Sequence, residues 1–404
     1  MTKCASGLAA MIAWIALIPV LSSQPDPGLP RSDPEALGLD IGRLRYIDEA
    51  VARALERKEI PGAVVLVARH GKIGYLKAFG NRVVRPALEP MTVDTIFDMA
   101  SLTKVMATAP AVVLLVQDGS VRLGDRVKRY LPKFAGGGKD AITIRQVLTH
   151  YSGLRPDFDL SKKWEGYETA LEELWKETTE SEPGKEFKYS DLNFIALGEM
   201  VRAASGKPLN EFVRERLYGP LGMTETAFQP PREWLARIAP TESRSRSEAY
   251  LKGQPVGSAD ILRGEVHDPT AWRMGGVAGH AGLFSSARDA AIYAQMLLNK
   301  GIYRGIRVLT APAVEAMTAA QSPKGAPAVR GLGWDIDSSY SSPRGDLWQA
   351  GYGHTGFTGT SLWVYPPHDL FVLILSNRVH PDGSGDATHL RGVIANIVAS
   401  AVID

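Results

Sequence analysis

The chain has 404 residues, of which 45% are hydrophobic and 22% charged, so it can fill a large buried core. Its 46 lysines and arginines nearly balance 44 aspartates and glutamates, which argues against a nucleic-acid-binding protein. The single cysteine, Cys4, precedes the first apolar run, and this position argues against a lipid-modified N-terminus and against disulfide chemistry in the exported chain.

Residues 1–23 have the layout of a secretory signal peptide, with Lys3 ahead of an apolar run over 8–21. The run is short for a membrane-spanning helix, so we expect export to the periplasm or the medium, with membrane contact only through this segment. An uncleaved anchor is the alternative. The proline-rich residues 24–37 predict an extended leader, and 38–404 form the folded body.

The apolar spacing predicts a helix over 41–55 and a last helix over 387–402. Paired apolar stretches over 64–76 and over 361–375, each interrupted by turn residues, predict two β-hairpins. Strands near both chain ends with helices between them predict an α+β fold. Its antiparallel sheet is built from both ends of the chain, is flanked by terminal helices and carries an inserted helical lobe.

Ser101-Leu102-Thr103-Lys104 opens a further apolar stretch, in which Pro110 predicts a kink or a boundary. Residues three apart share one helix face, so the Lys104 amine can reach the Ser101 hydroxyl. A neighbouring base makes a serine hydroxyl nucleophilic, and a helix N-terminus favours negative charge developing there. Taken alone, the tetrad favours an N-capping serine followed by a solvated lysine, and only the accompanying motifs change this interpretation.

Other motifs follow the tetrad in a set order. They are Tyr189-Ser190-Asp191, with Asn193 two residues on, and His354-Thr355-Gly356. Together with the stretches 97–104, 123–132 and 144–154, they resemble the superfamily of class C β-lactamases and penicillin-binding proteins over about residues 40–400. This superfamily includes esterases, D-amino-acid peptidases and muropeptide amidases. The resemblance implies a β-lactamase/transpeptidase-like fold of two lobes, with the active site in the cleft between them.

The resemblance also implies roles for single residues. Ser101 is the nucleophile, Lys104 and Tyr189 share proton transfer, and the backbone N–H groups of Ser101 and Phe357 form the oxyanion hole, where losing one donor costs about 3 kcal/mol. The residues expected to contact substrate are Asp191, Asn193, His354, Thr355, Gly356 and Arg378.

Two positions depart from the family pattern, Asp191 in place of asparagine and His354 in place of lysine. A carboxylate near Lys104 raises the pKa of the ammonium, and the ammonium in turn lowers the pKa of Tyr189, so we expect proton abstraction to fall mainly on Tyr189. A partly charged His354 is a weaker clamp for a substrate carboxylate than lysine, which disfavours a dedicated β-lactamase. Arg378 could replace it, or could be a solvated side chain.

Two glycine-rich segments, 264–268 and 275–285, contain His267, Asp268 and His280 and resemble a narrower branch of muropeptide amidases and carboxypeptidases. These three side chains could line the cleft, but we favour a role in holding the loops through bonds to the backbone. Because no H-E-x-x-H or cysteine spacing accompanies them, we expect no metal and no other cofactor. The absence of G-x-S-x-G disfavours an α/β-hydrolase.

The sequence therefore predicts an exported, monomeric serine hydrolase that acts through a Ser101 acyl-enzyme on a small molecule or peptidoglycan fragment. D,D-carboxypeptidase, muropeptide amidase and small-ester hydrolysis are the expected reactions. A class C-like β-lactamase is the alternative. A non-catalytic cell-wall or penicillin-binding protein is a further one, disfavoured by the intact Ser101, Lys104 and Tyr189, although Asp191 leaves it open.

Overall fold

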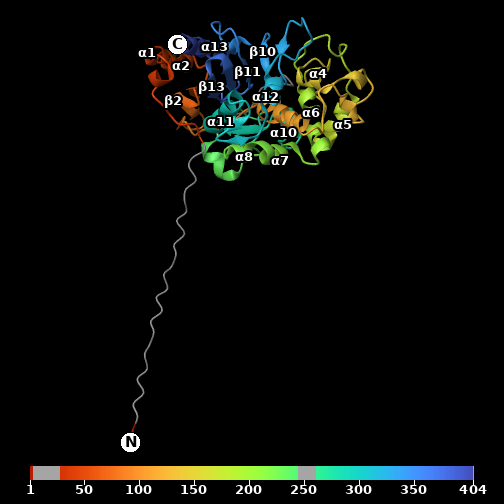
Figure 1. Cartoon of the computed structure of the whole chain (residues 1–404), viewed down its shortest axis with the longest axis horizontal. Helices are drawn as coiled ribbons and strands as arrows, with labels where there is room; N and C mark the ends of the chain where they lie inside the picture. The colour runs from red at the N-terminus through yellow and green to blue at the C-terminus, as the bar shows by residue number, and fades with distance from the viewer. Residues whose placement is uncertain (3–27, 244–260, 404) are drawn as a thin grey trace.

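The computed structural model describes residues 1–2, 28–243 and 261–403 (Figure 1). Most of the predicted signal peptide and residues 24–27 of the predicted leader therefore lie outside the described residues. None of the helices found in the described ranges has the length and hydropathy needed to cross a bilayer.

An eight-stranded antiparallel sheet forms the frame, in the order β3-β2-β1-β13-β12-β11-β10-β9. Strand β1 pairs with β13, where Leu66 lies opposite Leu373, so the two ends of the chain meet in the middle of the sheet. Both predicted hairpins are present, as β1–β2 and β12–β13. The strands are β1 (Gly62–Arg69), β2 (Lys72–Val83), β3 (Glu89–Pro90), β9 (Val329–Arg330), β10 (Asp335–Asp337), β11 (Tyr352–Thr355), β12 (Ser361–Tyr365) and β13 (Leu370–Ser376).

The central strands are buried on both faces, since alternate side chains enter two separate cores. In β1, Val64 and Leu66 join one core while Val65 and Val67 join the other. Terminal helices α1 (Ile41–Leu44), α2 (Tyr46–Glu56) and α13 (Thr388–Ala401) cover one face, and α11 (Ala287–Leu298) covers the opposite one (Figure 1). The helix predicted over 41–55 is thus two consecutive helices that meet at Arg45.

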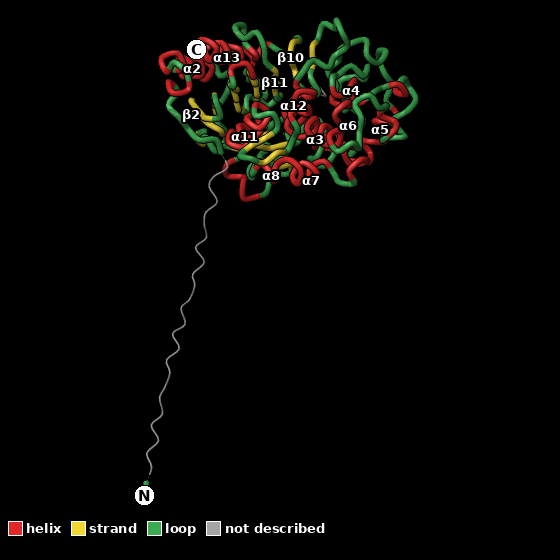
Figure 2. Tube along the Cα trace, viewed as in Figure 1, coloured by secondary structure: helices red, strands yellow, loops and turns green. Residues whose placement is uncertain are grey.

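The remaining helices gather away from the strands of the large sheet, as Figure 2 shows for α4, α5 and α6. They are α3 (Ala109–Gln117), α4 (Ile144–Leu148), α5 (Tyr167–Lys176), α6 (Asp191–Ser205), α7 (Leu209–Val213), α8 (Gly219–Leu221), α10 (Pro269–Arg273) and α12 (Ala311–Thr318). Short 3-10 turns lie at Glu35–Leu37, Val127–Arg129, Lys139–Ala141, Arg232–Arg237, Ser342–Arg344 and Pro366–His368. This confirms the predicted α+β fold.

Two small sheets complete the secondary structure of the residues that the structure describes. One has the order β4-β6-β5, with β4 (Ile96–Asp98), β5 (Ala227–Phe228) and β6 (Leu283–Ser286), and the other pairs β7 (Ile302–Tyr303) with β8 (Ile306–Arg307). Two π-helical turns lie at Lys104–Thr108 and Arg214–Tyr218. Pro110 falls in the first turn of α3, directly after the π-helical turn, and the helical backbone continues through it. The preceding carbonyls of Val105 and Met106 accept from the Tyr293 hydroxyl at 2.6 Å and the Tyr218 hydroxyl at 3.0 Å. The irregularity predicted at Pro110 is thus a change from π-helical to α-helical winding within one helical run.

Part of the expected leader packs on the folded body. Leu29 and Leu37 are buried, and the Ser32 N–H donates to the Ile73 carbonyl of β2 at 3.0 Å. Residues 29–37 therefore add to the edge of the sheet instead of standing free.

Candidate active site

Ser101 lies on a tight turn between β4 and the π-helical turn that begins at Lys104. The preceding Ala100 has φ of 46°, in the left-handed region that a β-carbon disfavours. The buried Asp98 carboxylate holds this turn by accepting the Ala100 N–H at 2.8 Å and the His267 N–H at 2.7 Å. Strain of this kind persists only where surrounding bonds enforce it, and here it presents the Ser101 side chain.

The Lys104 ammonium is fully buried beneath Ser101 and has three acceptors. Its Nζ lies 2.9 Å from Ser101 Oγ, 2.6 Å from Asp191 Oδ1 and 3.0 Å from the His280 carbonyl oxygen. An ammonium group has three N–H donors; two hydrogen-bond to Ser101 Oγ and the His280 carbonyl, and the charge is paired with Asp191. The structure thus places the lysine of the S-x-x-K motif in direct contact with the candidate nucleophile.

Burial keeps the Tyr189 phenol protonated, and the negative charge of Asp191 keeps Lys104 protonated. Burial lowers the pKa of Lys104, but the negative charge of Asp191, followed by Tyr189, outweighs it and leaves the pKa above its ordinary value. Burial raises the pKa of Tyr189, and the Lys104 ammonium lowers it by less than burial raises it. The expected effect of Lys104 on Tyr189 is therefore present, yet the net pKa of the phenol is raised.

Ser101 opens onto a cavity of about 170 Å³. The cavity is lined by Ser101, Tyr189, Arg330, Asp335, Tyr340, His354, Thr355 and Phe357. Five of these residues were singled out in the sequence, which means that the structure brings three separate motifs to one place. Arg330, Asp335 and Tyr340 were missed, because no motif or spacing marks them.

His354 is buried and brings no fixed positive charge to this cavity. Burial, followed by the cations of Arg330 and Lys104, lowers the pKa of His354 well below its ordinary value, so the imidazole is neutral near pH 7. The expectation of a partly charged histidine is corrected on this point. Arg330 does not replace it, since its Nη1 lies 3.1 Å from Asp335 Oδ1 and its charge is balanced.

The two amides expected to form an oxyanion hole are available as donors. Within the described part of the chain, the N–H groups of Ser101 and Phe357 have no hydrogen-bond acceptor. Gly356 allows the turn to approach the Ser101 segment, because a β-carbon at this position would lie 2.5 Å from the Met99 carbonyl oxygen and 2.1 Å from Thr360 Oγ1. Free backbone donors beside a nucleophile are what stabilisation of an oxyanion requires.

Four residues predicted to contact substrate do not line this cavity. Asp191 pairs with Lys104, and Gly356 is buried in the turn. Asn193 is buried on α6, with its Nδ2 3.4 Å from His150 Nδ1. Arg378 Nε donates to the Phe357 carbonyl at 2.6 Å.

His150 is a residue whose role in the site the sequence did not reveal. Its ring stacks on Tyr189 with centroids 4.4 Å apart, and burial, followed by Arg330, lowers its pKa well below the ordinary value. A neutral ring against the Tyr189 phenol limits how that phenol can turn. The stretch 144–154 contributed to the family resemblance, but nothing in it pointed to a contact with Tyr189.

The glycine-rich segments behave as loop supports. His280 Nε2 lies 2.9 Å from Asp268 Oδ1, and Asp268 caps α10 by accepting the Ala271 N–H at 2.8 Å. His267 Nε2 lies 2.7 Å from Glu242 Oε1. Asp191, Asp268 and His280 could each offer one metal ligand, with the ligand atoms within 4.8 Å of one another. The Lys104 ammonium already places a positive charge against Asp191.

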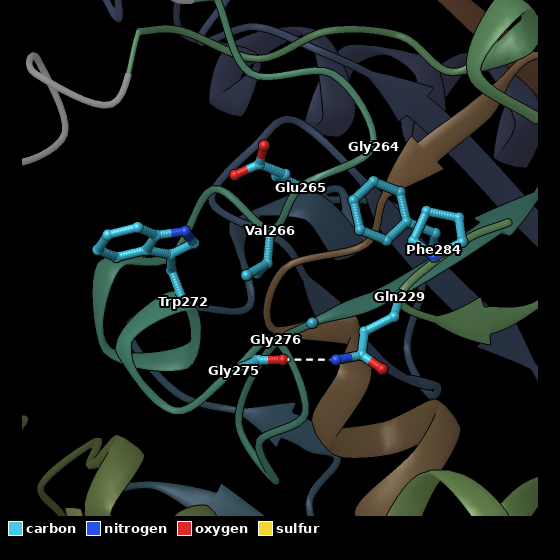
Figure 3. A pocket seen from close by; sticks show the side chains of 10 residues that line it. Gln229, Gly264, Glu265, Val266, Trp272, Gly275, Gly276 and Phe284 are labelled. Carbon is cyan, nitrogen blue, oxygen red and sulfur yellow. Dashed lines mark hydrogen bonds between the residues drawn. The ribbon is translucent and has the colours of Figure 1, made fainter. Parts of the chain in front are cut away.

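A second cavity, of about 370 Å³, is bordered by the 264–276 loop (Figure 3). Its lining includes Glu265, Trp272 and Gln229, whose Nε2 donates to the Gly275 carbonyl at 2.7 Å. None of its lining residues is a serine, lysine or tyrosine. This second cavity therefore lacks a hydroxyl nucleophile with an adjacent lysine, which the Ser101 cavity has.

Comparison with known proteins shows the family. The family model described as Beta-lactamase matches residues 47–395. A protein of Escherichia coli K12, provisionally named a D-alanyl-D-alanine carboxypeptidase, is 31% identical over 91% of this chain and 90% of its own length. The N-acetylmuramyl-L-alanine amidase of Bacillus subtilis 168 is 34% identical over 84% of this chain and 81% of its own.

Solved structures share the fold at lower identity. EstCE1, a hydrolase with promiscuous acyltransferase activity, is similar with a TM-score of 0.70 and 22% identity, over 89% of this chain and 99% of its own. A class C beta-lactamase is similar with a TM-score of 0.69 and 18% identity, over 89% of this chain and 96% of its own. These two likenesses establish the fold alone.

Proposed function

The chain belongs to the beta-lactamase family and is a serine hydrolase, and from this premise we propose that it forms an acyl-enzyme on Ser101. The main support is the 2.9 Å contact between Lys104 Nζ and Ser101 Oγ. Ser101 lines a cavity together with Phe357, and the backbone N–H groups of both residues lack a hydrogen-bond acceptor among the described residues. We propose an amide or ester related to peptidoglycan as the substrate.

In the proposed reaction, Ser101 Oγ attacks the substrate carbonyl carbon and its proton passes to the Tyr189 oxygen, in the fraction of molecules whose phenol is ionised. Lys104 remains an ammonium and stabilises that phenolate. The carbonyl oxygen becomes an oxyanion bound by the N–H groups of Ser101 and Phe357. The carbon–leaving group bond then breaks, the leaving group takes the proton from Tyr189, and water hydrolyses the ester on Ser101.

The charge of the cavity supports an internal amide as substrate. A neutral His354 and an Arg330 balanced by Asp335 offer a substrate carboxylate no unpaired cation along β11. This disfavours β-lactams and C-terminal D-alanyl bonds relative to the amide that joins a stem peptide to its sugar. A relative named for that amide, the Bacillus subtilis amidase, is among the most similar proteins.

The location we propose is the periplasm or the medium, on the layout of residues 1–23 and on the site of peptidoglycan itself. Two further expectations stay predictions, that the protein acts as a monomer and that it needs no cofactor.

Turnover tests this proposal. The purified protein is incubated with muropeptides, with the same stem peptides lacking the sugar, with p-nitrophenyl esters and with a chromogenic cephalosporin, and Ser101→Ala serves as the control. We expect release of stem peptide from muropeptides by the wild-type protein and none by Ser101→Ala. Hydrolysis of the cephalosporin alone would make the protein a β-lactamase, and binding without turnover would make it a non-catalytic protein.

A further inference from the structure

We propose that two arginines outside the catalytic motifs, Arg378 and Arg391, position the backbone turn that supplies the Phe357 N–H and thereby tune the oxyanion hole. The inference rests on the proposed function. Arg378 follows strand β13, and Arg391 lies on the C-terminal helix α13, on the face of the sheet opposite α11. Both act through the turn over 356–360, so they are positioning residues.

The contacts of the two guanidinium groups converge on this one turn. Arg391 Nη2 donates to the Gly356 carbonyl at 3.0 Å and to the Thr360 carbonyl at 2.9 Å. Arg378 Nε donates to the Phe357 carbonyl at 2.6 Å, and its Cζ lies 4.2 Å from the centroid of the Phe357 ring. Three of the five carbonyl groups in the turn are thus held by arginine.

The bond to Gly356 has a direct geometric consequence. The Gly356 carbonyl and the Phe357 N–H belong to the same peptide unit, which is planar and trans, so they point in opposite directions. Fixing the carbonyl oxygen against Arg391 therefore fixes the direction of the Phe357 N–H. A charged donor on the carbonyl also polarises the amide and strengthens its N–H as a donor, because hydrogen bonds in a chain reinforce one another.

The other side of the turn is tied to the segment that precedes Ser101. Thr358 Oγ1 donates to the Asp98 carbonyl at 2.7 Å, and Thr360 Oγ1 donates to the Met99 carbonyl at 3.1 Å. Two side chains of the turn that carries the Phe357 N–H are therefore hydrogen-bonded to the segment that leads to the Ser101 N–H. The two arginines bind the same turn through its carbonyl groups.

Arg391 is an unusual way to secure a turn, because burying a cation is costly. It is 7% exposed, and burial, followed by the neighbouring Arg378 cation, lowers its pKa to about 10. The hydrogen bonds described for Arg391 go to backbone carbonyls and none to a carboxylate. A positive charge without a hydrogen-bonded counterion beside the turn favours the negative charge that develops on the substrate oxygen.

Arg69 provides a matched control. It is 4% exposed and also donates to backbone carbonyls, those of Leu37 at 3.1 Å, Gly38 at 2.8 Å and His368 at 3.2 Å. It lies at the last residue of β1, away from the Ser101 cavity. Substituting Arg69 therefore removes the same kind of buried contact without touching the turn over 356–360.

The experiment compares Arg391→Met, Arg391→Lys, Arg378→Ala, Arg378→Lys and Arg69→Met with the wild-type protein. For each, kcat and KM for a p-nitrophenyl ester, the affinity for a boronic acid that mimics the tetrahedral intermediate, and Tm are measured. We expect Arg391→Met to lower kcat about 10- to 100-fold, somewhat less than complete loss of a donor would, with a parallel loss of boronic acid affinity and little change in KM. Arg391→Lys should recover part of both losses.

The control variants separate positioning from mere folding. Arg69→Met should lower Tm and leave kcat unchanged. If Arg391→Met is too unstable to assay, the half-buried Arg378 carries the test, with a loss of kcat in Arg378→Ala that Arg378→Lys partly reverses. A folded variant of either arginine that keeps wild-type kcat and boronic acid affinity overturns the inference. If the wild-type protein shows no Ser101 acylation by a fluorophosphonate, the proposed function fails instead, and the inference with it.

Discussion

The Lys104 ammonium nitrogen lies 2.6 Å from a carboxylate oxygen of Asp191, at the position where the family motif has asparagine. This contact helps to keep Lys104 positively charged, because Asp191 is the largest of the groups that raise its pKa. Tyr189, the proposed base, also has a raised pKa, so its ionisation near pH 7 costs free energy. We therefore expect the carboxylate at position 191 to shift the pH dependence of the reaction.

Asp191→Asn removes a carboxylate whose negative charge raises the pKa of Tyr189, the base in the proposed reaction, and also that of Lys104. A nearby charge shifts a pKa by roughly 1–3 units, so the alkaline rise of kcat/KM that follows ionisation of Tyr189 should move to lower pH by about one unit or more. The sign follows from the requirement for a deprotonated base, since a lower pKa makes that form available at lower pH. The measurement is the pH profile of kcat/KM for an ester, and an unchanged profile in a folded variant contradicts the role given to Asp191.

Tyr189→Phe tests the proton acceptor with little change of shape. The variant keeps the ring that stacks on His150 and lacks only the hydroxyl. We expect the acylation rate to fall by about 10²- to 10⁴-fold, the usual contribution of general base catalysis. Single-turnover acylation by a p-nitrophenyl ester measures this. A normal rate in Tyr189→Phe would show that Lys104 or Asp191 takes the proton.

Gly356→Ala tests the close approach of the oxyanion turn to the nucleophile. The added β-carbon would lie 2.1 Å from Thr360 Oγ1 and 2.5 Å from the Met99 carbonyl, so the turn must shift. We expect a loss of about 1–3 kcal/mol of stability by denaturant unfolding and a loss of most activity. Gly124→Ala is the matched control, because nothing lies within 4 Å of the added atom there. Equal effects at the two positions would refute the argument.

Asp157, which lies near the site, makes the free energy of unfolding depend on pH. Burial, followed by the negative charges of Asp191 and Asp268, raises its pKa from 3.8 to about 7, and Thr270 Oγ1 lies 3.0 Å from Oδ2. The folded state therefore holds a proton that the unfolded state loses, so this group's contribution to stability falls as the pH rises from about 4 to about 7.

Asp157→Asn imitates the protonated form at every pH. Its Tm should exceed that of the wild-type protein by several degrees at pH 8.5, and the difference should vanish near pH 4. Differential scanning calorimetry across this range measures the effect. A constant difference between the two proteins at all pH values would contradict the raised pKa.

The central strands of the sheet and the contact between Ser101 and Lys104 could be predicted from the sequence. Apolar runs bounded by turn residues predicted both central hairpins, because strands buried on both faces are apolar along their whole length. The spacing of Ser101 and Lys104 predicted their contact, because a helical turn brings residues three apart together. These are local patterns, and the structure reproduces them.

Contacts between distant segments left no comparable pattern. Arg330 and Tyr340 reach the cavity only because β9 and the loop after β10 fold back beside β11. Arg391 reaches Gly356 from the last helix. The neutral state of His354 depends on burial and on the cation of Arg330, neither of which can be read from neighbouring residues in the sequence.

Trapping the covalent intermediate shows whether Ser101 is the residue that is acylated. The protein is mixed with a slowly deacylating substrate or a fluorophosphonate, quenched in acid and digested, and the modified peptide is sequenced by mass spectrometry. We expect a single adduct on Ser101 in the wild-type protein and none in Ser101→Ala. An adduct on another residue, or turnover of muropeptides and esters that persists in Ser101→Ala, would contradict it.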